Sequence, residues 1–236
     1  MFSLIVVPAR MGSKRLPNKN LLEIGGLSLV ARAVSCAKQV SAVVPDTVVC
    51  VSSESMAVLD EGRKFGADIL VARPESLSGD SVTLIPVLQH AITSAEASLK
   101  DKCCQVTLLQ CTSPFRTAED VLGSLEVLEA TGCSSVLSVC ESVSSPYAHI
   151  LEKNPCGSYA KCKEGFEDIP RKQQVPQTFD INGAVFTWNA GVFSVDPRHL
   201  YDDTQIYTMP RLRSLDIDTE EDFKLAKCIV AAGLAD

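Results

Sequence analysis

Residues 2–20 read FSLIVVPARMGSKRLPNKN, and this stretch decides the fold. Its first part predicts a strand over Ser3–Val7 that is buried on both faces, because it is uniformly apolar. No basic residue precedes the apolar run, which favours a strand over a signal peptide. The second part, Pro8–Asn20, is a polar loop that follows the strand directly. Because open α/β sheets bind ligands where their strands end, the stretch predicts an α/β protein with a ligand site at this loop.

The first two thirds of the chain alternate apolar, β-branched runs with segments of helical period. This alternation predicts a parallel sheet covered by helices. Expected strands are Ser3–Val7, Thr47–Ser52, Asp68–Ala72, Val106–Gln110 and Ser135–Val139. Expected helices are Ser28–Gln39, Ser55–Phe65, Val82–Ser98 and Ala118–Thr131, and Thr117 with Asp120 predicts a capping box before the last helix.

The composition changes after about Ser144, where residues 145–185 are richer in Pro, Gly, Lys and polar groups. This change predicts a small insertion, either a lid or an oligomerisation arm, with a long functional loop as the alternative. The chain then returns to the main domain. Expected elements there are Ala184–Trp188, Gln205–Met209, Ser214–Ile217 and a helix Glu220–Ala231 whose start is signalled by Thr219 and Asp222. We therefore expect residues 1–144 and 186–236 to form the main domain and residues 145–185 the insertion.

Composition excludes several classes of protein. A chain of 236 residues allows one full-sized domain or a domain with a small appendage, and 46% hydrophobic residues rule out a disordered chain. A net charge of −7 argues against a broad nucleic-acid-binding surface, and no apolar run approaches the ~20 residues of a membrane helix. The ten cysteines form no CxxC motif and several lie in strand-like runs. They predict reduced core residues and a cytoplasmic protein.

The loop Pro8–Asn20 concentrates positive charge in an acidic protein. Gly12 and Ser13 allow close backbone approach, so that the N–H groups of the loop can bind phosphates. Arg10, Lys14 and Lys19 supply the positive charge that a triphosphate needs. A solvated basic loop is the alternative, but the position after the first strand favours phosphate binding. The absence of GxxxxGK[ST] and of GxGxxG argues against P-loop ATPases and nicotinamide enzymes.

Two aspartates near the end of the chain form a candidate metal site. If the stretch Ser214–Thr219 is extended as in a strand, Asp216 and Asp218 point to the same face, because side chains alternate with period two. Two carboxylates on one face suit Mg²⁺, which takes its other ligands from water and phosphates. The alternative is one aspartate capping the next helix and one solvated. Together with a phosphate-binding loop, the pair favours a metal site.

Three further stretches carry weaker signals. Leu108–Thr117 ends a strand, and its Gln110, Ser113 and Arg116 either bind a ligand or form an ordinary turn. Arg73-Pro74 lies at another strand end, with Asp80-Ser81 shortly after it. The stretch 171–174, RKQQ, is a solvated face or, if the insertion closes over the crevice, a grip for an anionic substrate.

Four motifs in this order, PARMGSKRLPNKN, LLQCTSPFRT, RKQQVPQTFDINGAVF and SLDIDTEEDF, resemble those of the CMP-sialic acid synthetases (acylneuraminate cytidylyltransferases) over nearly the whole chain. The resemblance implies a Rossmann-like three-layer nucleotidyltransferase domain with a mostly parallel sheet and a small α+β dimerisation insertion. It also implies a homodimer that converts CTP and an acidic nine-carbon sugar, a nonulosonic acid, into the CMP-sugar and pyrophosphate with Mg²⁺. Neither nucleic acid nor membrane is an expected partner.

The resemblance also implies residue roles. It makes Arg10, Lys14, Asp216 and Asp218 catalytic, with both aspartates as metal ligands. Nucleotide binding is implied for Ala9, Arg10, Gly12, Ser13, Lys14, Lys19, Asn20, Arg73, Asp80, Ser81 and Gln110. Sugar binding is implied for Gln110, Ser113, Arg171, Lys172, Gln173 and Phe186.

Four positions depart from the family pattern and bear mainly on which sugar is used. Lys172 replaces an arginine, which weakens a bidentate grip on a carboxylate. Glu54 ends the stretch where the family has Ser-Thr-Asp, Phe186 replaces a tyrosine, and Cys111 replaces a proline. Alternative readings keep the chemistry but use pseudaminic, legionaminic or 3-deoxy-octulosonic acid as acceptor, or transfer a guanylyl group. A non-catalytic nucleotide-binding homologue is a further alternative.

Overall fold

The computed structural model describes residues 1–79, 81–164 and 175–235. Seven strands form its central sheet in the order β11-β7-β10-β6-β1-β4-β5. Only β10 runs antiparallel to its two neighbours among these described strands, so the expected mostly parallel sheet is confirmed. The strands are β1 Phe2–Pro8, β4 Thr47–Ser53, β5 Ile69–Ala72, β6 Cys103–Leu109, β7 Ser135–Glu141, β10 Phe179–Asn189 and β11 Gln205–Thr208.

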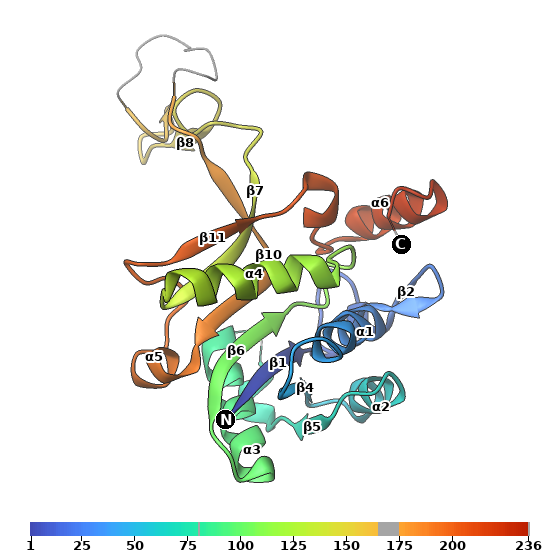
Figure 1. The fold of residues 1–236 in the computed structure, drawn as a ribbon. Helices are drawn as coiled ribbons and strands as arrows, with labels where there is room; N and C mark the ends of the chain where they lie inside the picture. Colours follow the sequence, from blue (N-terminus) through green and yellow to red (C-terminus); the bar gives the residue numbers. More distant parts are fainter. Residues whose placement is uncertain (80, 165–174, 236) are drawn as a thin grey trace.

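Helices cover both faces of the sheet (Figure 1). One face packs against α1 Leu29–Ser41, α2 Met56–Lys64 and α4 Ala118–Thr131, and the other against α3 Leu84–Leu99 and α5 Ala190–Val195. The C-terminal α6 Glu220–Ala231 joins the hydrophobic cluster of the first face and contacts β2 (Glu23–Ile24). Strand β1 shows why: Ile5 and Val7 join the first hydrophobic cluster and Leu4 and Val6 the second, because successive side chains alternate. No helix within the described ranges is long and apolar enough to cross a membrane.

The elements predicted from the sequence are found within three residues of their expected ends over the first 131 residues. The predicted capping box of Thr117 and Asp120 forms at α4. Thr219 and Asp222, expected to mark the start of the last helix, also form a capping box at α6. The short helix α5 and the small hairpin of β2 (Glu23–Ile24) with β3 (Leu27–Ser28) were not predicted.

The strand expected over Ser214–Ile217 is wrong. Residues Arg211–Ser214 form a 3₁₀ helix, η4, and an extended segment follows that pairs with no strand of the described sheet. The amide of Ile217 instead donates to the carbonyl oxygen of Thr112 at 2.8 Å, in the turn after β6. The segment therefore crosses the end of the sheet rather than extending it.

The segment after β7 projects away from the sheet (Figure 1). It contains a two-stranded hairpin of β8 Leu151–Lys153 and β9 Tyr159–Lys161. We call the described part of this projecting segment, residues 142–164, the arm. Strand β10 leads back into the sheet, with an irregular register between Ile181 and Phe186. The expected domain boundary at residue 185 thus falls inside a continuous strand.

Candidate active site

A cavity of about 370 Å³ opens where the parallel strands end. The loops after β1, β5 and β6 and the start of α3 form its walls, as open α/β sheets place their ligand crevices. Asp216 and Asp218 complete the wall, although they follow the loop of β1 by about two hundred residues. The residues that line it are Pro8, Arg10, Ser13, Lys19, Asn20, Arg73, Leu77, Ser78, Gly79, Val82, Thr83, Leu84, Val87, Gln110, Cys111, Thr112, Asp216 and Asp218.

The basic loop is fastened to the acidic segment by a buried lysine. Lys19 Nζ donates to the carbonyl oxygen of Ile217 at 2.7 Å and to Asp218 Oδ1 at 3.0 Å. Arg15 Nη1 reaches the other oxygen of Asp218 at 3.2 Å from the exposed side. Asn20 Nδ2 donates to the carbonyl oxygen of Arg10 at 2.9 Å and so fixes the fold of the loop on itself. The loop after β1 and the segment with the two aspartates are therefore in direct contact, although they are far apart in the sequence.

The two aspartates face the cavity from an extended segment. Burial raises the pKa of Asp216, a hydrogen bond with Thr112 lowers it, and the neighbouring Asp218 carboxylate raises it again. Ile217 lies between them with no exposed surface, so the side chains alternate as in a strand although no strand forms. Burial has the largest effect, so the pKa of Asp216 is raised even though the nearby Lys19 ammonium also lowers it.

The donor set suits a divalent cation supplied together with phosphates. No group of three or more His, Cys, Asp or Glu side chains arranged to hold a metal occurs among the described residues. Two carboxylates are nevertheless enough for Mg²⁺, which keeps several waters and binds substrate phosphates. Asp216 and Asp218 line the same cavity as the cations that would hold phosphates, so their carboxylates fit the expected metal.

Gln110 faces the cavity at the end of β6, beside an unusual turn of β10. Gly183 has φ +71°, and a Cβ there would lie 3.2 Å from Gln110 Nε2, so a larger residue would disturb both. Asn182 next to it accepts from Ser138 Oγ at 2.6 Å and donates to Ser214 Oγ at 2.8 Å. Asn182 thereby ties β7 and β10 to the segment that carries the aspartates.

Apart from Ser113 and Phe186, the structure places the expected site residues in three groups. Arg10, Ser13, Lys19, Asn20, Arg73, Gln110, Asp216 and Asp218 meet at the cavity. Ala9 is buried, while Gly12, Lys14 and Ser81 are exposed, and none of these four lines the cavity. Asp80, Arg171, Lys172 and Gln173 lie outside the described residues.

Two residues expected to bind sugar are instead in the interior. The Phe186 ring packs 5.8 Å from the Trp188 ring and 6.2 Å from the His199 ring, because its position on β10 faces the hydrophobic cluster under α3. Ser113 is 1% exposed and its hydroxyl has no hydrogen-bond partner among the described residues. Among the described residues, neither side chain lines the cavity at the strand ends or the one beyond the two aspartates.

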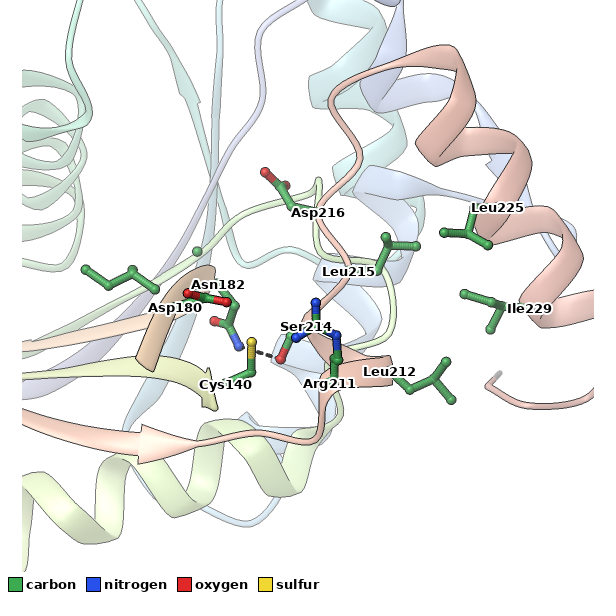
Figure 2. Close-up of a pocket in the computed structure, with 12 residues that line it drawn as sticks. Cys140, Asp180, Asn182, Arg211, Leu212, Ser214, Leu215, Asp216, Leu225 and Ile229 are labelled. Carbon is green, nitrogen blue, oxygen red and sulfur yellow. Dashed lines mark hydrogen bonds between the residues drawn. The ribbon is translucent and has the colours of Figure 1, made fainter. Parts of the chain in front are cut away.

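The extended residues 215–218, which carry Asp216 and Asp218, are called the aspartate segment below. A second cavity of about 760 Å³ lies on the other side of this segment. Asp216 lines both cavities, which makes them neighbours. Figure 2 shows the Arg211 guanidinium beside Ser214 within this second cavity, with Leu225 and Ile229 of α6 opposite. Arg211 is the only cation among its described lining residues, whereas Asp180 and Asp216 are acidic.

The residues that line this second cavity were not predicted from the sequence. Arg211 and Leu212 come just ahead of the aspartate segment, and their position before SLDID was the available signal. The sequence carried no signal for Asn182 or Thr112, because their contacts are with segments distant in sequence.

A cavity at the strand ends that combines cations with hard oxygen ligands is the arrangement expected of an α/β nucleotidyltransferase. Residues 4–229 match the family model described as "Cytidylyltransferase". The chain belongs to the cytidylyltransferase family.

Curated relatives agree with this family. The chain is 24% identical over 227 residues to the "Post-translational flagellin modification protein B" of Campylobacter coli, spanning 96% of this chain and 94% of the relative. It is 29% identical over 230 residues to the "CMP-N,N'-diacetyllegionaminic acid synthase" of Legionella pneumophila, spanning 95% and 94%. Over 225 residues it is 30% identical to the "N-acylneuraminate cytidylyltransferase" of Escherichia coli, spanning 94% of this chain and 50% of that protein.

The chain thus spans about half the length of the N-acylneuraminate cytidylyltransferases that it matches. Among solved structures, a CMP:2-keto-3-deoxy-manno-octonic acid synthetase complexed with CTP has a TM-score of 0.67 at 17% identity, covering 99% of this chain and 100% of the other. This likeness establishes the shared fold.

Proposed function

We propose that the protein transfers CMP from CTP to the anomeric hydroxyl of a nonulosonic acid and releases pyrophosphate. The observation that carries the proposal is the single cavity in which Arg10, Lys19 and Arg73 meet Asp216 and Asp218. Family membership supports cytidylyl transfer. Relatives named for N-acylneuraminate, legionaminic acid and pseudaminic acid support a nine-carbon acidic sugar as acceptor.

In the proposed reaction, the anomeric oxygen of the sugar attacks the α-phosphorus of CTP. The bond from that phosphorus to the bridging oxygen of the β-phosphate breaks, pyrophosphate leaves with its electron pair, and the hydroxyl proton passes to solvent. Such transfers depend on positioning and charge stabilisation rather than on covalent help from the protein. Arg10 and Lys19 would bind the phosphates, and Arg73 and Gln110 the rest of the nucleotide.

Asp216 and Asp218 would hold Mg²⁺, which supplies charge neutralisation at the phosphates and lowers the pKa of the attacking hydroxyl. Lys19 already contacts Asp218, so the lysine would keep the basic loop and the metal ligands in register. Lys14, which is exposed, would reach the leaving phosphates from the solvent side.

The acceptor would lie in the second cavity. Asp216 borders both cavities, so a sugar held there has its reactive carbon next to the nucleotide. Arg211 would pair with the sugar carboxylate, because a guanidinium binds a carboxylate with two parallel hydrogen bonds. The leucine and isoleucine side chains of the opposite wall would contact apolar parts of the sugar.

We further propose a cytoplasmic homodimer that associates through the arm. Its exposed apolar side chains, Val143, Ile150, Leu151 and Tyr159, support an interface between two copies. All ten cysteines are described and all are free thiols, which supports a reducing compartment.

The test is pyrophosphate release from CTP, ATP, GTP or UTP against N-acetylneuraminic, legionaminic, pseudaminic and 3-deoxy-octulosonic acids. We expect release with CTP, Mg²⁺ and a nine-carbon acid, and its loss with EDTA. CTP binding without turnover on any of these acids would contradict the proposal and favour a nucleotide-binding homologue. Release with GTP but not CTP would indicate guanylyl transfer.

Asp216→Asn tests the metal role in the same assay. We expect turnover to fall by about 10²–10³, the scale seen when one charge-stabilising group is lost at a catalytic site. Binding of Mn²⁺ in the presence of CTP, followed by electron paramagnetic resonance, should weaken in parallel. Asp60→Asn, an exposed change on α2, serves as the control and should leave both measurements unchanged.

A further inference from the structure

Glu54 stands directly after β4, the strand between β1 and β5. Its two carboxylate oxygens contact the ends of both neighbours. Oε1 accepts from the backbone amide of Met11, in the basic loop after β1, at 2.8 Å. Oε2 accepts from Arg73 Nη2, directly after β5, at 2.7 Å. One side chain therefore joins the two loops that border the nucleotide cavity.

Arg73 depends on this contact. Its side chain is only 4% exposed, yet it lines the cavity. Its Nε is buried and has no hydrogen-bond partner among the described residues. A buried guanidinium is costly unless it is paired, and Glu54 is the acid that pairs it here. The guanidinium thus has one N–H donor, at Nε, that no described residue accepts.

Glu54 is suited to carry a full negative charge at this place. Its partial burial alone would raise its pKa, but the hydrogen bonds from Arg73 and from the Met11 amide hold the pKa below its usual value. The carboxylate is ionised at neutral pH and balances the guanidinium.

We propose that Glu54 is a positioning residue for the nucleotide: it acts through Arg73, which it holds in the cavity wall, and through Met11, where it fixes the first turn of the phosphate-binding loop. The inference rests on the proposed function in one respect, that this cavity binds CTP.

If Glu54 acted only through its charge, removing that charge would change the affinity for CTP in the opposite direction from a loss of positioning. Removing a negative charge beside the cavity would strengthen attraction to an anionic triphosphate. Positioning predicts weaker binding, because an unpaired guanidinium leaves its buried place. The sign of the change in CTP affinity therefore separates the two roles.

The experiment measures the Kd of CTP and of pyrophosphate by isothermal titration calorimetry. Glu54→Gln keeps a carbonyl oxygen for the Met11 amide but loses the charge that holds Arg73. We expect its Kd for CTP to rise about tenfold or more, the scale of one hydrogen bond to a charged group. Its Kd for pyrophosphate, which would contact Arg10 and Lys19, should stay within twofold of the wild type.

Coupling to Arg73 distinguishes positioning from a general loss of stability. In an Arg73→Ala background, Glu54→Gln should no longer change the CTP Kd, because the group through which it acts is gone. An equal fold-change in both backgrounds overturns the proposal. Glu54→Asp keeps the charge but is one methylene shorter, and its Kd should lie between those of the wild type and the Gln variant.

A matched control exists elsewhere in the chain. Glu96 also accepts from a backbone amide, that of Cys103, with one oxygen and from a cation, Lys102, with the other, away from the cavity. Glu96→Gln should leave the CTP Kd unchanged whatever it does to stability. Urea unfolding of each variant reports stability separately.

The outcomes separate the two hypotheses. A CTP Kd within twofold of the wild type, or tighter, for Glu54→Gln overturns the positioning role while leaving the proposed function intact. If that variant does not fold, Glu54→Asp decides in the same way: a raised Kd supports the role and an unchanged one rejects it. A wild-type protein that fails to bind CTP overturns the proposed function itself.

Discussion

Asp216 and Asp218 differ in how their charges are balanced. Asp218 is paired with Lys19 and Arg15, whereas burial raises the pKa of Asp216. Replacing Asp218 would therefore release the basic loop as well as remove a metal ligand. Replacing Asp216 isolates the metal contribution, which is why it is the better probe of the proposed chemistry.

Burial also divides the cysteines into reactive and protected thiols. Cys50 and Cys111 are buried, which raises the pKa of each to about 12. Cys156 is exposed, and a hydrogen bond with Ser158 lowers its pKa. Because the thiolate is the reactive form, iodoacetamide at pH 7.5 should label Cys156 rapidly and leave Cys50 and Cys111 unlabelled, as read by peptide mass spectrometry.

The Ser158→Ala variant checks the cause. Loss of the hydroxyl should raise the pKa of Cys156 and slow its labelling, with exposed Cys228 as the internal standard. Labelling of Cys111 at the rate of Cys228 in the native protein would contradict the buried environment of Cys111.

At the scale of elements, the start of α4 connects to the aspartate segment. Asp120 has no exposed surface. It caps α4 by accepting from the Thr117 amide at 3.0 Å, and it binds Arg213 of η4 through two hydrogen bonds of 2.8 and 2.9 Å. Because Arg213 precedes Ser214 and the aspartates, this ion pair fixes where their segment leaves the 3₁₀ helix.

Asp120→Asn should lower the free energy of unfolding by about 2–3 kcal/mol in urea titrations, because it leaves Arg213 without its carboxylate. The expected loss is below that of a fully buried pair, since a third of the Arg213 side chain is exposed.

Glu119→Gln, one residue earlier on the same helix and exposed, should change stability by less than about 0.5 kcal/mol. Equal losses for the two variants would contradict the expected contribution of Asp120 and its pair with Arg213.

At the scale of the molecule, the arm exposes apolar side chains that a monomer leaves in water. Leu151 and Tyr159 are 59% and 65% exposed on the two strands of its hairpin. We expect light scattering to give twice the chain mass of 25.4 kDa. The double variant Leu151→Glu, Tyr159→Glu should be a monomer, because burying unpaired charges in an interface is costly.

The control for this prediction is Leu234→Glu, an equally exposed residue near the C-terminus and outside the arm. A wild-type monomer at micromolar concentration, or dissociation by the control alone, would contradict association through the arm.

Local patterns were the most predictable part of the fold. Uniformly apolar runs and capping residues act over a few positions, so β1, α4 and α6 were expected close to their observed bounds. The segment 214–217 was mistaken for a strand because an apolar alternation looks the same whether or not a partner strand is present. Phe186 was expected at the sugar because its neighbours match a motif, but the pleat of β10 turns its ring into the core.

The sequence alone determined the alternation of strands and helices, the basic loop and the acidic pair, because each depends on residues that are neighbours along the chain. Only the tertiary structure decided that Lys19 meets Asp218, that Glu54 joins Met11 to Arg73, and that Asp216 separates two cavities. These contacts depend on the order in which strands pair across the sheet, and strand order is set by the packing of the whole core.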